Sequence, residues 1–143
     1  MAMRTVVSLL RAVNLGGRQV KKDQLIAIHE AAGCIAPATF IASGNVLFET
    51  RERDLGKLAR RIEAEFERAA GFRSEAILRT LDELREVAAG NPIAGRKDLD
   101  GSKLLVTFLA AAPERTAIDA AMALAAESGL PEEMRVVGRE LFL

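Results

Sequence analysis

The residues with the clearest chemical potential lie in a glycine-containing loop that follows the first apolar run of the chain. Its cationic, amide and glycine residues are Arg11, Asn14, Gly16, Gly17, Arg18, Lys21 and Lys22. Paired glycines expose backbone amides, and the N-terminus of a following helix carries partial positive charge. Together these groups favour binding of a phosphate or another small anion. The alternative is that the glycines only form a turn, that Arg11 pairs with a carboxylate and that Asn14 caps the loop.

A second polar pair, Ser43 and Asn45, lies between two short apolar runs in residues 39–49. The Gly44-Asn45 dipeptide predicts a β-hairpin with a two-residue turn, because both residues tolerate positive φ. Such a hairpin puts Ile41, Val46 and Phe48 on one face of the sheet, and Phe40, Ala42 and Leu47 on the other. The alternative is one long strand with a bulge at Gly44.

These two polar regions form one site if the first and third strands are neighbours in the sheet. Ser43 and Asn45 then lie beside Arg11 and Lys21, and the hypothesis is a single anion-binding or ligand-binding site. The sheet face that carries Phe40 is too apolar to remain in water, so it predicts contact with the second unit, with another copy of the protein or with a ligand.

No catalytic constellation is found in the sequence, which favours a binding role over an enzymatic one. With one histidine and one cysteine, the chain cannot supply the three or four nitrogen and sulfur ligands of a zinc site. We expect His29 to be a partly buried or solvated helix residue, and Cys34 to be a small buried hydrophobe at a helix end. Nucleotide-binding glycine motifs of known type are absent. We therefore predict no metal and no cofactor.

Composition restricts the class of protein. The chain has 143 residues, half of them hydrophobic, which is enough for one compact domain or two small ones. Its 20 basic and 20 acidic residues cancel, so no net charge attracts it to nucleic acid or to an anionic membrane. The longest apolar run, residues 104–113, is too short to span a bilayer, and the first residues do not resemble a signal peptide. The expectation is a cytoplasmic protein.

The first half of the chain has the element order of a ferredoxin-like α/β plait. We predict strand, helix, two hairpin strands, helix and strand over residues 1–80, an α+β arrangement. The single elements are a strand at 6–10, a helix at 23–32, the hairpin at 39–49, an amphipathic helix at 55–69 and a strand at 75–79.

The second half predicts a connector followed by a shorter repeat of the same order. Thr80 to Glu83 has the form of a capping box and predicts a helix at 81–89, which with the turn-rich stretch 95–102 forms a connector over 81–102. An incomplete second plait-like unit follows at 103–143, with a strand at 104–109, a helix at 113–127 and a hairpin at 135–143 turning near Gly138. The sequence ends inside an apolar strand, so either it is truncated or another surface covers that edge.

Two stretches carry a resemblance to a known family. LLRAVNLGG at residues 9–17 and TFIASGNVLF at 39–48, together with Asn91-Pro92, resemble the uncharacterised bacterial family known as domain of unknown function 1697. Its typical forms are LLRGINVGG and TYIQSGNVVF. The resemblance implies a pair of ferredoxin-like units, bacterial and cytoplasmic, with no established activity. Here Ala12 replaces the usual Gly, Ala42 replaces the usual Gln, and the usual last segment is missing.

Three hypotheses follow. The favoured one is a protein that binds a small anionic or phosphate-bearing ligand at the Arg11 loop and the Ser43–Asn45 tip. The second is an interaction module that forms a homodimer through the open sheet face or the C-terminal edge strand. The third, ranked last, is nucleic-acid binding, which the neutral charge and the absence of Trp and Tyr disfavour.

Overall fold

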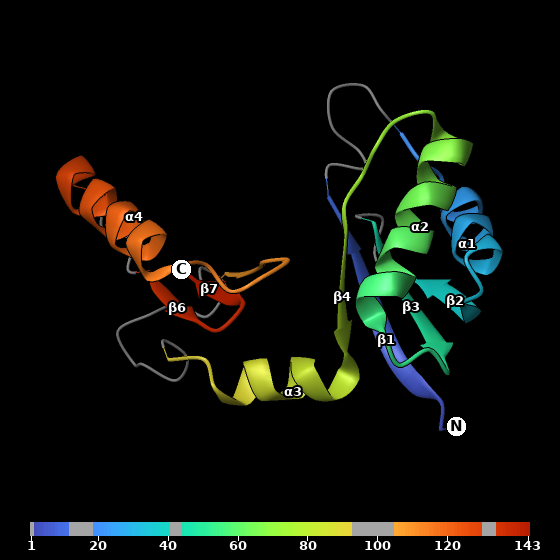
Figure 1. The fold of residues 1–143 in the computed structure, drawn as a ribbon, viewed down its shortest axis with the longest axis horizontal. Coiled ribbons are helices and arrows are strands. Elements are labelled where there is room, and N and C mark those ends of the chain that lie inside the picture. The colour runs from blue at the N-terminus through green and yellow to red at the C-terminus, as the bar shows by residue number, and fades with distance from the viewer. Residues whose placement is uncertain (1, 12–18, 41–43, 93–104, 130–133) are drawn as a thin grey trace. The chain divides into compact units, whose positions relative to one another are not determined.

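The computed structural model of the chain describes residues 2–11, 19–40, 44–92, 105–129 and 134–143. The chain divides into two compact units, Met1–Arg85 and Glu86–Leu143, and each contains an antiparallel sheet (Figure 1). The protein is therefore mixed α+β. The elements of the first part are β1 (Arg4–Leu10), α1 (Lys22–Ala31), β2 (Ile35–Thr39), β3 (Asn45–Thr50), α2 (Leu55–Ala70), β4 (Ala76–Thr80) and α3 (Leu81–Ala89). Those that follow are β5 (Val106–Phe108), α4 (Arg115–Ser128), β6 (Arg135–Val137) and β7 (Glu140–Phe142).

The sheet of the first unit has the strand order β2-β3-β1-β4, with every neighbouring pair antiparallel. The expectation that the first and third strands are neighbours is thus confirmed. Alternation along the strands sends Val6, Val46 and Phe48 into the core, where they pack against the helices. The residues between them, such as Val7 and Leu47, belong to the opposite face.

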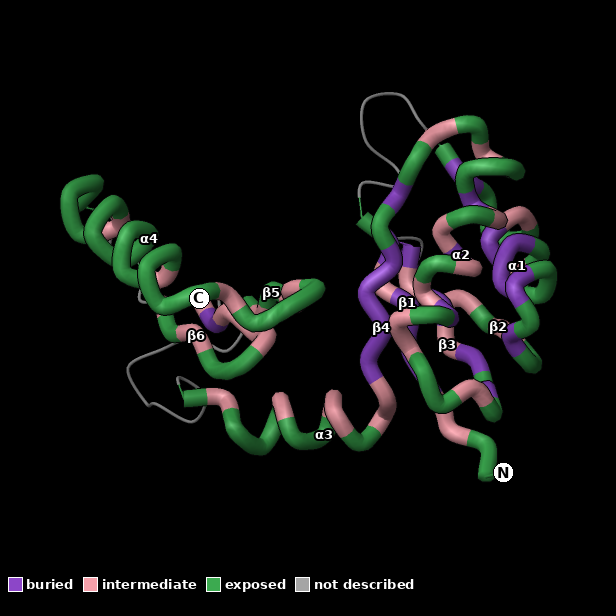
Figure 2. Tube along the Cα trace, in the orientation of Figure 1, coloured by how far each residue is buried: buried purple, intermediate pink, exposed green. Residues whose placement is uncertain are grey.

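Helix α2 supplies the most regular packing surface of the first unit. Leu58, Ile62 and Phe66 recur every four residues and are fully buried, as the amphipathic pattern predicted. Asp54 caps the start of the helix by accepting a hydrogen bond from the Lys57 amide at 3.0 Å. Figure 2 shows the buried residues concentrated in the strands and in the inner faces of α1 and α2.

The capping box predicted at Thr80 forms with both of its hydrogen bonds. The Glu83 amide donates to the Thr80 Oγ1 atom at 3.1 Å, and the Thr80 amide donates to the Glu83 Oε1 atom at 2.9 Å. Two amides of the first turn are thereby satisfied, and α3 begins directly after β4. The predicted helix at residues 81–89 is confirmed.

The segment around Gly44 is a hairpin of two strands, so the alternative of one bulged strand is wrong. The predicted register is also wrong, because Leu47 pairs with Ala38 and β2 ends at Thr39. The bulge lies instead within β2, between Ile35 and Ala38. Ala36 has a φ of 50° there, and the next residue, Pro37, has no N–H to donate to the ladder. Ile41 and Ala42 lie outside the described residues.

In the second unit, the three-stranded sheet has the order β5-β7-β6. The predicted hairpin turns at Gly138, whose φ of 59° is in the left-handed region. Strand β5 pairs with the other side of β7 through Thr107 and Leu141, so the C-terminal strand is central and the prediction of a C-terminal edge strand is wrong. Helix α4 has no buried residue. The predicted linker at 95–102 lies outside the described residues.

Among the helices of the described residues, none has the length and apolar character needed to cross a membrane.

Candidate functional site

The C-terminal end of β1 and the N-terminal end of β3 lie side by side at one end of the first sheet. Leu9 is paired with Asn45, and the Leu10 amide donates to the Gly44 carbonyl at 3.3 Å. On one side the Phe40 amide donates to the Asn45 carbonyl at 3.0 Å, and on the other the Arg11 amide donates to the Glu75 carbonyl at 3.1 Å. We call this row the strand-end rim; it consists of Phe40, Gly44, Asn45, Leu9, Leu10, Arg11 and Glu75.

The polar residues of the strand-end rim share the sheet face that points away from the helices. Val46 and Leu10 are in the helix-packed core. Because successive side chains alternate between faces, Asn45 and Arg11 are on the opposite face. Glu75 precedes Ala76, whose side chain is in the core, so the same alternation puts Glu75 on that face. Residues of three different strands therefore present their side chains on one surface.

Arg11 is held by its main chain, while its side chain stays in water. The Ser74 Oγ atom donates to the Arg11 carbonyl at 2.7 Å. The Arg11 guanidinium lies 3.2 Å from the Glu75 carboxylate, and the two side chains are 70% and 62% exposed. A carboxylate partner for Arg11 is what the alternative interpretation of this loop predicted. An exposed ion pair of this kind contributes only about 0–1 kcal/mol, so the guanidinium can exchange Glu75 for another anion.

Lys21 is the N-cap residue of α1, and its side chain is exposed. The Lys21 carbonyl accepts the first helical hydrogen bond, from the Leu25 amide at 3.0 Å. The side chain of Gln24 donates to the Ala69 carbonyl at 3.2 Å, which ties the first turn of α1 to the end of α2. Figure 1 shows α1 beginning at the end of the sheet where β1 finishes, which is the end that carries the strand-end rim.

Four predicted site residues, Asn14, Gly16, Gly17 and Ser43, lie outside the described residues. Of the other three, the structure brings Arg11 and Asn45 together in the strand-end rim. Lys21 is the N-cap of α1, which packs on the other face of the sheet, so it is not brought together with them. Sequence reasoning missed Glu75 and Ser74 as neighbours of Arg11. The contact with Glu75 follows from the antiparallel pairing of β4 with β1. Leu10 pairs with Ala76, so the next residue of β1, Arg11, is opposite the preceding residue, Glu75.

A groove of about 550 Å³ lies between α2 and the connection to β4, and it includes Glu75. Its other lining residues are Arg60, Glu63, Ala64, Glu67, Arg73 and Ser74. Glu63 accepts a hydrogen bond from the Ala76 amide at 3.1 Å, and Glu67 forms an ion pair with Arg73 at 3.4 Å. These two carboxylates hold the connection between α2 and β4 in place, and this connection carries Glu75 of the strand-end rim. We therefore assign Glu63 and Glu67 a structural role and not that of a catalytic acid–base pair.

His29 is fully buried in the last turn of α1, which corrects the expectation of a partly buried or solvated residue. It continues the inner stripe of the helix that begins with Leu25 and Ile28. Its Nδ1 atom lies 2.8 Å from the Leu25 carbonyl, which can only accept, so Nδ1 carries the proton. The buried Nε2 atom has no hydrogen-bond partner among the described residues. Burial lowers the pKa of His29, and the hydrogen bond to Leu25 opposes this in part.

We expect the stability of the protein to fall as the pH drops below about 6.5, in part because of His29. Its folded pKa is lowered, so the unfolded state takes up the proton first. The contribution of the neutral ring is thus complete above the unfolded pKa and is lost as the pH falls toward the folded pKa. Urea unfolding at several pH values, followed by circular dichroism, measures this. A His29→Leu variant should show a weaker dependence, and an identical dependence in both proteins would contradict the assignment.

Cys34 is a buried residue that follows the C-cap of α1, Ala32, and Gly33. Burial raises the pKa of its thiol to about 12, and the nearby positive charge of Arg61 offsets this only in part. A thiol with this pKa is protonated near neutral pH and is a poor nucleophile, so the prediction of a small buried hydrophobe is confirmed. Within the described ranges, no group of three or more His, Cys, Asp or Glu side chains is arranged to hold a metal ion.

Comparison with known proteins gives a family and a fold. A family model described as "Protein of unknown function (DUF1697)" matches residues 3–142. Among solved structures, the chain is similar to a conserved bacterial protein from Streptococcus pneumoniae, with a TM-score of 0.71 and 22% sequence identity over 99% of this chain and 76% of that chain. Identity at this level indicates a shared fold. No curated protein has significant similarity to the chain.

Proposed function

The chain belongs to the DUF1697 family of proteins of unknown function, as its two motifs predicted, and we propose that it binds a small anionic, phosphate-bearing ligand at the strand-end rim. The observation that carries this proposal is the pairing of Leu9 with Asn45, which joins two strand ends that are distant in sequence. The residues proposed to bind the ligand are Arg11, Asn14, Gly16, Gly17, Lys21, Ser43 and Asn45.

The charges around the strand-end rim support an anionic ligand. A phosphate can form two parallel hydrogen bonds with a guanidinium, and such charge-assisted contacts are stronger than an exposed ion pair. The phosphate can therefore displace Glu75 from Arg11, whose main chain is already fixed by Ser74. The start of α1, where Lys21 is the N-cap, carries the positive end of a helix dipole, and we propose that it adds to the positive charge at this end of the unit.

The test is calorimetric titration with inorganic phosphate and with AMP. We expect the Arg11→Ala/Lys21→Ala double variant to lose at least about tenfold in affinity for both, because a hydrogen bond to a charged group contributes about 1.5–3 kcal/mol. The Glu75→Gln variant should bind phosphate more tightly than the natural protein, because it removes the anion that competes for Arg11.

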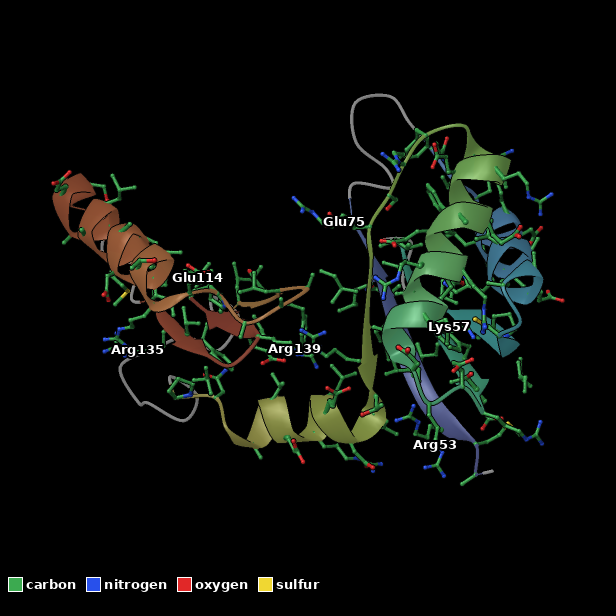
Figure 3. The ribbon with its side chains drawn as sticks, viewed as in Figure 1. Arg53, Lys57, Glu75, Glu114, Arg135 and Arg139 are labelled. Atoms are coloured by element: carbon green, nitrogen blue, oxygen red, sulfur yellow. The ribbon has the colours of Figure 1, made fainter. Side chains whose placement is uncertain are left out.

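A matched control removes two exposed cations from the other end of the first unit. Arg53 precedes α2 and Lys57 belongs to its first turn, so both follow the end of β3 in the chain, and both are exposed (Figure 3). An Arg53→Ala/Lys57→Ala variant changes the net charge equally and should leave both affinities unchanged. If the Arg11/Lys21 and Arg53/Lys57 variants give the same isotherm as the natural protein, this site is ruled out.

We also propose the finer architecture. Residues 1–80 form a ferredoxin-like unit, residues 81–102 a connector helix and linker, and residues 103–143 an incomplete second plait-like unit. The strand order β2-β3-β1-β4 of the first sheet supports this, because it matches the order that the strand-helix-strand-strand-helix-strand plait requires. A cytoplasmic location remains a prediction from the sequence.

A second candidate function is self-association through the face of the first sheet that lies opposite the helices, at the end that carries Phe40; elsewhere on that face Val7, Ile77 and Arg79 are buried. Phe40 is 60% exposed and belongs to that face, which favours contact with another copy of the protein. Light scattering over a range of concentrations tests this, and a strict monomer at high concentration would exclude it. Nucleic-acid binding ranks last, and an absence of binding at low salt would exclude it.

A further inference from the structure

Phe40 is the aromatic residue of the strand-end rim, and a phosphate alone would make no use of its ring. The chain has six phenylalanines, and all of them are within the described residues. Phe48, Phe66 and Phe142 are buried, and Phe72 and Phe108 are intermediate. Only Phe40 is exposed among them. An aromatic ring in water offers a flat apolar surface to any planar group that binds beside it.

The strand register puts Phe40 on the same face as the polar residues of the strand-end rim. Thr39 is paired with Val46, whose side chain is in the core. The next residues, Phe40 and Asn45, are joined by a backbone hydrogen bond of 3.0 Å and lie on the opposite face by alternation. That face also carries Arg11, so the Phe40 ring and the Arg11 guanidinium project from the same side of the sheet.

The distance between the ring and the cation suits one small ligand. Phe40, Asn45 and Leu9 lie in one row across β2, β3 and β1, and Arg11 is two residues beyond Leu9. Neighbouring strands are about 5 Å apart and residues on one strand rise about 3.3 Å each, so the backbones of Phe40 and Arg11 are roughly 12 Å apart. Both side chains extend from the same face and can approach the two ends of one molecule.

We infer that the ligand carries a planar aromatic or heterocyclic ring in addition to its phosphate, as a mononucleotide does. The phosphate binds Arg11, the ring stacks on Phe40, and the linking atoms pass over Asn45. This inference rests on the proposed function, since it assigns the second half of the same ligand. Stacking on an aromatic side chain does not require a particular base, because every base has a π face.

The experiment compares phosphates that differ in their rings, in the full-length chain. AMP and CMP carry a purine and a pyrimidine, pyridoxal 5′-phosphate carries a ring close to its phosphate, and ribose 5-phosphate carries no aromatic ring. We expect the ring-bearing phosphates to bind more tightly than ribose 5-phosphate. The Phe40→Leu variant keeps an apolar side chain without the ring, and should lose roughly 5- to 150-fold in affinity for the ring-bearing ligand while its affinity for ribose 5-phosphate is unchanged.

A fluorescent variant gives a second readout. The chain contains no Trp and no Tyr, so a Phe40→Trp variant has a single tryptophan at the strand-end rim. Its emission should be quenched when a ring-bearing phosphate binds and should stay constant with ribose 5-phosphate. Leu124 is also exposed but belongs to α4 in the second unit, so a Leu124→Trp variant is the matched control and should not respond.

The outcomes separate this inference from the proposed function. Equal affinities for AMP and ribose 5-phosphate, both lowered by Arg11→Ala and unaffected by Phe40→Leu, would overturn the stacked ring and keep the anion site. No binding of any of these phosphates would overturn both. A ring preference that Phe40→Leu abolishes would support both, and the ranking of AMP, CMP and pyridoxal 5′-phosphate would then identify the type of ring.

Discussion

Replacing Phe66 with Ala is expected to lower the free energy of unfolding by about 3–5 kcal/mol. Phe66 is fully buried on the inner face of α2 and packs edge-to-face against Phe72, with the ring centroids 5.2 Å apart. Truncation removes the buried ring and leaves a cavity that the helix and sheet cannot fill completely. Urea unfolding followed by circular dichroism measures the change, since the chain has no Trp or Tyr for fluorescence.

The matched control is the same substitution at Phe40. That side chain is 60% exposed, so Phe40→Ala should change the free energy of unfolding by no more than about 0.5 kcal/mol. The comparison holds the chemical change constant and varies only burial. Equal losses in the two variants would show that Phe66 is not a core residue, and the packing of α2 on the sheet would have to be revised.

Replacing Val46 with Asp should prevent the first unit from folding stably. Val46 is fully buried on the helix-packed face of β3. An aspartate there puts a charge without a partner into the core, which costs several kcal/mol and is comparable to the total stability of a small domain, about 5–15 kcal/mol. Circular dichroism should show a large loss of ordered structure at neutral pH.

Leu47→Asp is the control, because it moves the same charge by one residue. Leu47 is half-buried and belongs to the opposite face of the sheet. We expect this variant to fold, with a loss of about 0.5–3 kcal/mol. A folded Val46→Asp protein beside an unfolded Leu47→Asp protein would mean that the faces of β3 are reversed, and the positions of Asn45 and Arg11 on a common surface would no longer hold.

Elements that depend on local chemistry could be predicted from the sequence. The capping box at Thr80 and Glu83 gave the bounds of α3, because both of its hydrogen bonds form within a single turn. Helix α2 could be predicted from its apolar residues, because their spacing of three and four residues over a long segment matches the helical period and not that of a strand. In these segments neighbours in the sequence determine the structure.

Pairing between distant segments was harder to predict. The Gly44-Asn45 dipeptide predicted a two-residue turn, yet β2 ends at Thr39 and its bulge lies at Ala36 and Pro37. The turn signal was real, because Gly44 has a φ of 87°. The register depends on the whole length of β2 and on which residues of β3 face the core. A turn motif contains neither kind of information.

The candidate site shows the same division. Arg11 and Asn45 could be named from the sequence, because glycine-rich turns and exposed polar residues are visible there. Glu75 could not, because its contact with Arg11 requires β4 to pair with β1 in one particular register. The burial of His29 was missed because histidine is intermediate between the buried and exposed residue types. Its environment depends on tertiary packing, which places its ring 5.8 Å from that of Phe48.

The bulge in β2 makes the two edges of the first sheet differ in how well they can pair with an added strand. At the β2 edge, Ala36 bends the strand and Pro37 has no N–H to donate, so another strand could not form a continuous row of hydrogen bonds with it. The other edge is β4, whose residues 76–80 contain no proline and follow a regular register with β1. The β2 edge is therefore the less suitable of the two for pairing with an added strand.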